Sequence, residues 1–220
     1  MLLARRRVED LTPSKLTSSH RRLVIDASVL INILGTGCPD VIFQSLRRAF
    51  FIDEITLREV SVNPATGGSP KEVLAQLQAH GLLQVIHMDD LAYERFIGFT
   101  GAHSPDDLDD GEAATLAQAA CGKYVAVIDE RKAIRIASLL IPNISLLNSI
   151  DLLAAQDLLQ LLGTDGVSTV VHLALRNARM RVPPSARKWI SDLLGEKRAQ
   201  ECPSLGPLHL YRNQGTASQE

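Results

Sequence analysis

Carboxylates that directly follow apolar runs are the residues of this sequence whose type and position best suit chemistry. Asp26 follows residues 23–25 and Asp129 follows residues 124–128, two short runs rich in β-branched side chains. Such runs, without alternation of polar and apolar residues, are typical of strands buried on both faces of a parallel sheet. Ligands bind beyond the carboxyl ends of these strands, so we expect both side chains at one edge. A single such Asp often caps a turn or a helix, but two favour a functional site.

Two glutamates extend this acidic set. Glu112 occupies the N-terminal end of a row of apolar residues spaced by four, on the apolar stripe of an expected helix. A carboxylate at a buried edge is costly unless a cation or hydrogen bonds satisfy it. The alternative for Glu112 is a capping box with Asp109 as the N-cap, and Thr56 with Glu59 is a candidate for a second box.

The elements that must position these side chains alternate along the chain. Further strands are expected at residues 50–52, 83–86 and 144–147, and helices at 72–77, 113–120 and 134–138. Strands that alternate with helices indicate βαβ units, with helices on both faces of a parallel sheet. Beyond residue 147 the pattern is helical, at residues 150–162, 166–177 and 183–194. The expected fold class is therefore α/β, with three layers (α/β/α), a central parallel sheet of four to five strands, and C-terminal helices.

The chain divides into four parts. Residues 1–21 are polar and basic without periodicity, so we expect a flexible arm. Residues 22–150 hold the strands and the carboxylates and form the expected catalytic domain. Residues 151–198 are expected to form a helical extension packed on the same domain. Residues 199–220 contain Pro and Gly and end in polar residues, which predicts a disordered tail.

Four segments, taken in order, resemble the motifs of PIN-domain nucleases. They are residues 24–31 (VIDASVLI), a strand ending in Asp with Ser two residues later; 57–60 (LREV), a Glu after the second strand; 110–117 (DGEAATLA), the Gly-Glu form of the third motif; and 127–133 (VIDERKA), a strand-final Asp before a basic helix. Order and spacing agree across residues 22–150. The helical remainder resembles the extension found in one branch of PIN proteins.

The resemblance implies a metal-dependent endoribonuclease that hydrolyses single-stranded or structured RNA. Several carboxylates converging on one pocket repel one another strongly, and without a cation some must hold protons. Ligands that are all oxygen favour Mg²⁺ or Mn²⁺ over zinc, and no cluster of His and Cys offers an alternative. We expect Asp26, Glu112 and Asp129 as the metal ligands, and Glu59 as an outer group or a base that positions water.

Two further residues have expected supporting roles. Ser28 is a candidate to hydrogen-bond a carboxylate or the phosphate, with a bond to a backbone amide at the helix start as the alternative. Asp110, together with Asp109, is close enough in sequence to support the metal ligands. The alternative for both is a solvated acidic loop at residues 106–110.

The net charge of −2 is an average over unlike segments. Residues 1–22 carry six Lys and Arg against two Asp and Glu, residues 23–170 carry nine against nineteen, and residues 171–200 carry seven against two. An acidic body flanked by basic segments suits a metal pocket that must accept a polyanion.

The RNA backbone needs positive charge beside an acidic pocket. Arg131, Lys132 and Arg135 follow Asp129 and are expected to contact flanking phosphates, with a solvated helix face as the alternative. A second basic cluster lies within residues 176–188.

Other acid-rich α/β classes fit less well. A hydrolase with an aspartyl nucleophile needs Asp-x-Asp after its first strand, where this chain has Asp26-Ala27-Ser28, and no Gly-Lys-Ser/Thr phosphate loop occurs. Three distant cysteines form neither a disulfide framework nor a zinc pattern, which predicts a cytoplasmic protein. No run of about 18 apolar residues occurs, so no membrane span is expected.

The resemblance also implies partners. Many small PIN proteins resemble the toxins of toxin–antitoxin pairs, so a cognate antitoxin and a homodimer are expected on that ground. The competing hypothesis is a catalytically inactive PIN fold that binds RNA or a protein without cutting.

Overall fold

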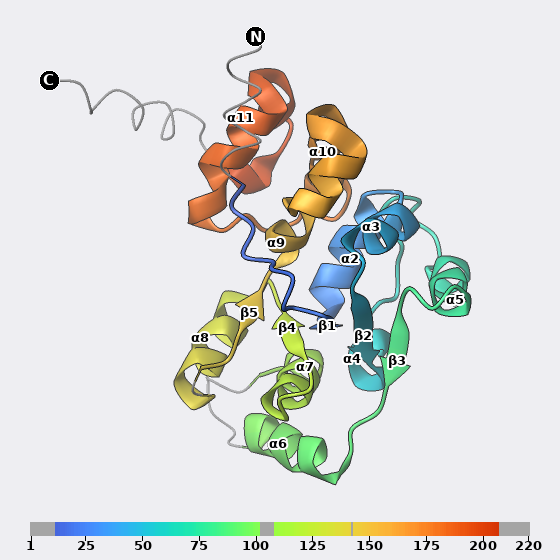
Figure 1. The fold of residues 1–220 in the computed structure, drawn as a ribbon, viewed down its shortest axis with the longest axis vertical. Helices are drawn as coiled ribbons and strands as arrows, with labels where there is room; N and C mark the ends of the chain where they lie inside the picture. The colour runs from blue at the N-terminus through green and yellow to red at the C-terminus, as the bar shows by residue number, and fades with distance from the viewer. Residues whose placement is uncertain (1–11, 102–107, 142, 207–220) are drawn as a thin grey trace, which may run out of the picture.

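The computed structural model describes residues 12–101, 108–141 and 143–206. Within them lies one sheet with all of its neighbouring strands parallel, in the order β3-β2-β1-β4-β5 (Figure 1). Along the chain, β2 and β3 are added in turn on one side of β1, and β4 and β5 are then added on its other side. The strands are β1 (Arg22–Ile25), β2 (Ala49–Asp53), β3 (Gln84–Ile86), β4 (Val125–Val127) and β5 (Leu146–Leu147).

The two faces of the sheet are covered by separate helical layers, which confirms the expected three-layer α/β class. Leu23 and Ile25 point into one buried cluster and Val24 into the other, because side chains alternate across a strand. One layer contains α2 (Ala27–Gly35), α3 (Pro39–Leu46) and α5 (Lys71–Ala79), and the other contains α6 (Asp90–Thr100), α7 (Asp110–Ala120) and α8 (Arg131–Leu140). In Figure 1, α6 and α7 lie below the strands and α8 lies beside β5, while α2 and α3 lie above the strands.

The C-terminal helices continue the core of the α2 layer. They are α9 (Ser149–Leu153), α10 (Gln156–Asn177), α11 (Pro184–Gln200) and the 3-10 turn η1 (Pro203–Leu205). Val171 and Ile190 are fully buried in the same cluster as Leu30 of α2. These helices therefore share one hydrophobic core with the sheet.

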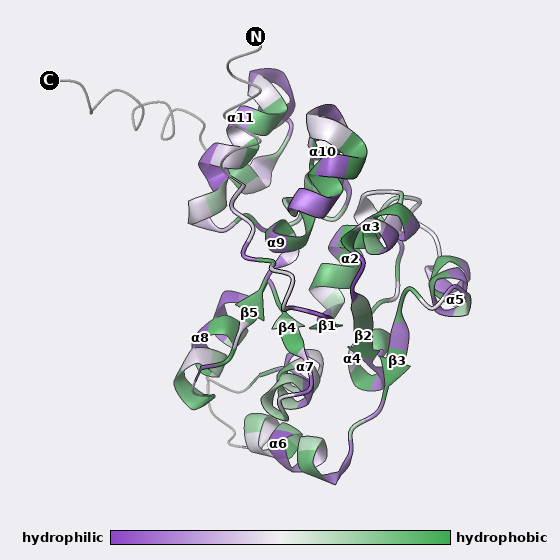
Figure 2. Cartoon of the chain, in the orientation of Figure 1, coloured by the Kyte–Doolittle hydropathy of each residue, from purple (hydrophilic) through white to green (hydrophobic). Residues whose placement is uncertain are grey.

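Gly163 breaks α10 into two pieces, because its φ of +64° lies in the region that favours glycine. Among the described residues, α10 taken as a whole is the one single helix long and apolar enough by composition to cross a membrane, and half of its most apolar segment is buried in the protein. Hydrophilic turns interrupt the hydrophobic ones along it (Figure 2). After the break, the 14 remaining residues span about 21 Å, less than the roughly 30 Å of a bilayer core.

The structure moves both expected terminal boundaries. Residues 12–21, expected in a flexible arm, run against α9: the Ser14 hydroxyl donates to the Asp151 carbonyl (2.6 Å), and the Lys15 amide donates to the Asp151 carboxylate (2.7 Å). Residues 199–206, expected in a disordered tail, finish α11 and form η1, because Cys202 and Leu205 are buried in the main core. The remainder of the arm (1–11) and of the tail (207–220) lies outside the described residues.

Candidate active site

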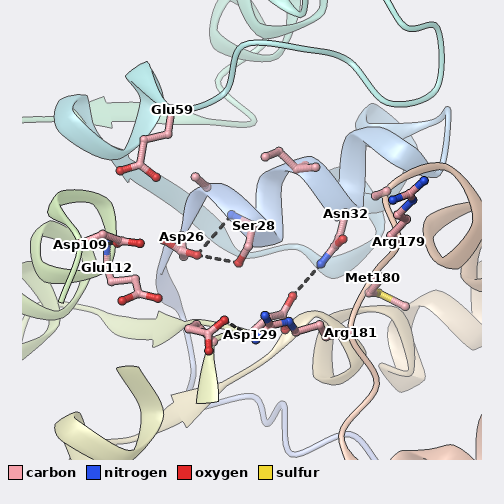
Figure 3. Close-up of a pocket in the computed structure, with 14 residues that line it drawn as sticks. Asp26, Ser28, Asn32, Glu59, Asp109, Glu112, Asp129, Arg179, Met180 and Arg181 are labelled. Atoms are coloured by element: carbon pink, nitrogen blue, oxygen red, sulfur yellow. Dashed lines mark hydrogen bonds and ion pairs between the residues drawn. The ribbon is translucent and has the colours of Figure 1, made fainter. Parts of the chain in front are cut away.

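A cleft of about 420 Å³ opens at the carboxyl ends of β1 and β4, where the strand order reverses. Such a switch point leaves a crevice, because the helices that follow the two strands leave toward opposite faces of the sheet. The structure brings four sequence-predicted carboxylates together here (Figure 3). The charged residues of the lining are Asp26, Glu59, Asp109, Glu112, Asp129, Glu130, Arg179 and Arg181.

Asp26 joins β1 to α2 and is only 4% exposed. Its side chain caps α2: one oxygen, Oδ2, accepts from the Ser28 amide (3.2 Å) and from the Ser28 hydroxyl (2.6 Å). Burial raises the pKa of Asp26, and the bonds from Ser28 oppose that rise. The Ser28 hydroxyl thus bonds a carboxylate, as expected, while the backbone amide at the helix start is capped by Asp26 instead of by Ser28.

Asp129 is held by three donors from two other elements. The Ser149 amide donates to Oδ1 (2.8 Å), while the Ser149 hydroxyl (2.5 Å) and the Asn32 amide group (2.7 Å) donate to Oδ2. Burial nevertheless raises the pKa of Asp129. Asn32 and Ser149 were not among the sequence candidates, although each carries a signal. Asn32 interrupts the apolar run of α2, and Ser149 is the first residue of the helix after the last strand, much as Ser28 lies in the first turn of the helix after the first strand.

Glu112 combines the two interpretations that its sequence position allows. Its amide donates to the Asp109 carboxylate (3.0 Å), so Asp109 is the N-cap of α7. Its own side chain faces the cleft and the residue is 6% exposed. Burial, followed by the charges of Asp109, Asp26 and Glu130, raises the pKa of Glu112 to about 7. Asp110, the other expected supporting residue, is exposed and does not line the cleft.

Glu59 is the C-cap of α4 (Glu54–Arg58), and its side chain reaches the cleft over Gly111. A Cβ on Gly111 would lie 2.4 Å from Glu59 Oε1, so the close approach of this carboxylate requires glycine. Burial and the charges of Asp109 and Asp26 raise the pKa of Glu59, whereas the Gly111 amide lowers it. Gly111 of the third motif therefore leaves room for the carboxylate of Glu59, which belongs to the second motif.

The expected capping box of Thr56 and Glu59 is wrong. Asp53 is the N-cap of α4, since its carboxylate accepts from the Ile55 amide (2.9 Å). The Thr56 hydroxyl instead donates to the Gly111 carbonyl (3.0 Å), which ties α4 to α7. These contacts fix the helix that carries Glu59 against the helix that carries Glu112.

Positive charge reaches the cleft from the loop between α10 and α11. Figure 3 shows Arg179 on the side of the cleft opposite Glu59 and Asp109. Arg181 forms an ion pair with Glu130. Of the cations expected to bind RNA, Arg131 is the first residue of α8 and lines an adjoining hollow, whereas Lys132 and Arg135 line neither space.

The donor chemistry of the cleft fits a divalent cation that prefers oxygen. Asp26 and Glu112 are buried carboxylates with raised pKa values, and the charge of Asp26 is among the causes that raise the pKa of Glu112 and of Asp129. A cation would relieve both the repulsion and the desolvation. In the conformation described, no three acidic, His or Cys side chains of residues 12–101, 108–141 and 143–206 are placed around one common point. Rotations about side-chain bonds would be needed for Asp26, Glu112 and Asp129 to share an ion.

Fold and cleft together define a class: a parallel α/β domain, covered by helices on both faces, with an acidic cleft at the switch point of its sheet. A family model described as DUF3368, a PIN domain, matches residues 22–196, so the chain belongs to the PIN-domain family. The match includes α9, α10 and most of α11, so these helices lie within the region that the family model covers. No curated protein and no solved structure matches the chain. Since PIN domains are in general nucleases, this chain has a nuclease fold.

Proposed function

We propose that this PIN domain is a Mg²⁺- or Mn²⁺-dependent ribonuclease that hydrolyses phosphodiester bonds of RNA. The observation that carries the proposal is one cleft in which buried carboxylates with raised pKa values stand beside arginines. Buried carboxylates of this kind suit a cation, and arginines suit the phosphates of a polyanion. The family supports hydrolysis of nucleic acid, and the choice of metal and of RNA is our inference.

Each side chain then has a role that its surroundings allow. Asp26, Glu112 and Asp129 would hold the divalent ion, which supplies charge neutralisation and Lewis acidity to the phosphate and the attacking water. Glu59 is the most exposed of the four predicted carboxylates and, with its raised pKa, suits the acceptance of a proton from that water. Arg179 suits a contact to a phosphate oxygen from the opposite side.

Neighbouring polar residues support two of these carboxylates, Asp26 and Asp129, by hydrogen bonds. Ser28 holds Asp26 from within α2, and Ser149 with Asn32 holds Asp129 from α9 and α2. Partners of this kind restrict the rotation of a ligand side chain and keep its ionised form available.

The test is cleavage of labelled single-stranded RNA in Mn²⁺ and in EDTA by the wild type, Asp26→Asn and Glu72→Gln. Asn is as good an N-cap as Asp, so D26N should fold. Glu72 lies exposed on α5, away from the cleft, and its variant removes the same charge. We expect metal-dependent cleavage by the wild type and E72Q, reduced at least about 1,000-fold in D26N.

Cleavage that persists in EDTA or in D26N would contradict the proposal. A wild type that binds RNA and never cuts it would instead support the alternative, an inactive PIN fold that binds RNA or a protein. The toxin role, a cognate antitoxin, a homodimer and a cytoplasmic location stay predictions from the family resemblance. Light scattering after size-exclusion chromatography tests the homodimer.

A further inference from the structure

A second hollow adjoins the acidic cleft and differs from it in charge. It measures about 450 Å³ and shares Asp129 and Arg181 with the cleft, so the two spaces are neighbours across these residues. Its other charged lining residues are Arg131 and Arg187. Three guanidinium groups therefore face a single carboxylate here, whereas six carboxylates and two guanidinium groups line the cleft.

The three arginines come from three separate elements. Arg131 is the first residue of α8, Arg181 lies in the loop before α11, and Arg187 lies in the first turn of α11. The one carboxylate, that of Asp129, already accepts three hydrogen bonds from Ser149 and Asn32. Arginines thus outnumber carboxylates in the wall of the hollow by three to one.

We propose that this hollow binds the phosphate backbone of the single-stranded nucleic acid next to the scissile bond. The proposal rests on the proposed function, because it places the reacting phosphate in the acidic cleft. A strand that continues past Asp129 and Arg181 enters the hollow, where guanidinium groups can each bind phosphate oxygens through two parallel hydrogen bonds. The C-terminal helices thereby become part of the substrate-binding surface.

The remaining lining of the hollow indicates which part of the nucleic acid, backbone or bases, it can recognise. Ile134, Val182 and Pro183 are small or aliphatic, Asn148 and Ser204 are polar, and none is aromatic. Sequence-tolerant stacking of bases needs aromatic faces, and discrimination between bases needs groups aimed at their edges. The hollow therefore holds the backbone and positions the strand, with little preference for its sequence.

The ion pair between Arg181 and Glu130 stands where the two spaces meet. The Arg181 side chain is 63% exposed, and pairs this exposed contribute little to stability. A phosphate can therefore replace Glu130 as the partner of Arg181. Removing the competing charge by Glu130→Gln should strengthen binding of the strand about twofold to threefold.

The test measures binding and cleavage separately. A short fluorescein-labelled single-stranded RNA of mixed sequence is titrated by anisotropy in EDTA over a range of KCl concentrations, and cleavage of the same RNA is followed in Mn²⁺. The variants are Arg131→Gln and Arg187→Gln, from different helices, so that a folding defect in one leaves the other informative. Lys188→Gln is the matched control, because Lys188 follows Arg187 on α11, pairs with Asp192 and lines neither space.

We expect R131Q and R187Q each to bind roughly tenfold more weakly than K188Q. Each should also lower the slope of log affinity against log salt by about 0.7, the value for one lost phosphate contact on a single strand. Wild-type cleavage with R131Q and R187Q binding as K188Q does would overturn this inference and leave the proposed function standing. Arginine-dependent binding without any cleavage would uphold the hollow and reject the nuclease. A wild type that neither binds nor cuts would reject both.

Discussion

Three aspartates stand at the carboxyl ends of strands in this sheet, and their surroundings give them different roles. Asp53 ends β2, is 1% exposed, and uses both oxygens in structural bonds, from the Ile55 amide (2.9 Å) and the Gln118 side chain (2.8 Å). Asp26 and Asp129 follow β1 and β4 and face the acidic cleft. All three stand directly after apolar residues, so their local sequences alone do not distinguish them.

The position of each strand in the sheet explains the difference. β1 and β4 are neighbours, and the strand order reverses between them. The carboxyl ends of these two strands therefore border the crevice. β2 lies on the other side of β1, and α4 and α7 pack over its end. A strand-final carboxylate thus faces the cleft at the switch point, even where it also caps a helix as Asp26 does, whereas Asp53 does not line the cleft and serves as a cap.

The largest expected effect comes from replacing a strand-final Asp by Asn, which we compare at the cleft (Asp129) and at the end of β2 (Asp53). Asp129→Asn should lower metal-dependent RNA cleavage at least about 1,000-fold, equivalent to about 4 kcal/mol of activation free energy. Asp53→Asn should leave kcat within a few-fold and instead lower the free energy of unfolding by about 1–2 kcal/mol, because a buried bond is lost. Cleavage assays and urea unfolding of both variants check this. Equal loss of activity in the two would remove the distinction between them.

A smaller effect is expected from the residue that holds Asp129. Ser149→Ala removes the hydroxyl bond and frees the carboxylate to rotate, so Mn²⁺ affinity and cleavage should fall about 10- to 100-fold. Isothermal titration with Mn²⁺ measures the affinity. Ser138→Ala is the control, since the Ser138 hydroxyl bonds only within α8, on an exposed face. Unchanged metal affinity in S149A would show that Asp129 needs no such support.

The raised pKa of Glu112 predicts how stability depends on pH in the metal-free protein. A carboxyl whose pKa rises from 4.5 to about 7 on folding binds its proton more tightly in the folded state. The free energy of unfolding should therefore fall as pH rises from about 4.5 to 7 and stay level above. We expect a fall of about 1–2 kcal/mol, less than the roughly 3 kcal/mol of the full shift, because solvent screens this partly buried group. Urea unfolding in EDTA, compared between wild type and Glu112→Gln, isolates this group. A difference between the two proteins that does not change with pH would contradict it.

The smallest effect is expected at the glycine beneath Glu59. Gly111→Ala adds a Cβ where the Glu59 carboxylate now lies, and the flexible end of that side chain can move aside. Cleavage should fall several-fold, while stability changes by less than about 1 kcal/mol because alanine also favours the helix. Cleavage rates and the melting temperature test this, with Gly98→Ala on α6 as the control that meets no neighbour. Full activity in G111A would show that Glu59 does not act from its present position.

Much of the fold and of the site is predictable from sequence, because both depend on local patterns. The apolar runs before Asp26 and Asp129 identify two of the strands, and the row containing Glu112 identifies its helix. The contacts of Ser149 and Arg179 depend on how α9 and the loop before α11 return to the sheet. No periodicity encodes such returns, which bring Ser149 to Asn32 and Arg179 to the cleft of Asp26, in each case across more than a hundred positions.

The same limit applies to the terminal boundaries. Residues 199–206 are rich in turn-forming residues, and this composition predicts a tail. Cys202 and Leu205 nevertheless fill space against α11, a tertiary contact that composition does not carry. Ser14 likewise contacts α9 through a single hydrogen bond to a distant carbonyl.

A crystal soaked in Mn²⁺ tests the central claim most directly, through the anomalous difference map at the carboxyl ends of the strands. The account expects a peak in the cleft, within about 2.2 Å of carboxylate oxygens of Asp26, Glu112 and Asp129, and none beside Asp53. A map without a peak in the cleft at saturating Mn²⁺, in a protein that still cuts RNA, would contradict it.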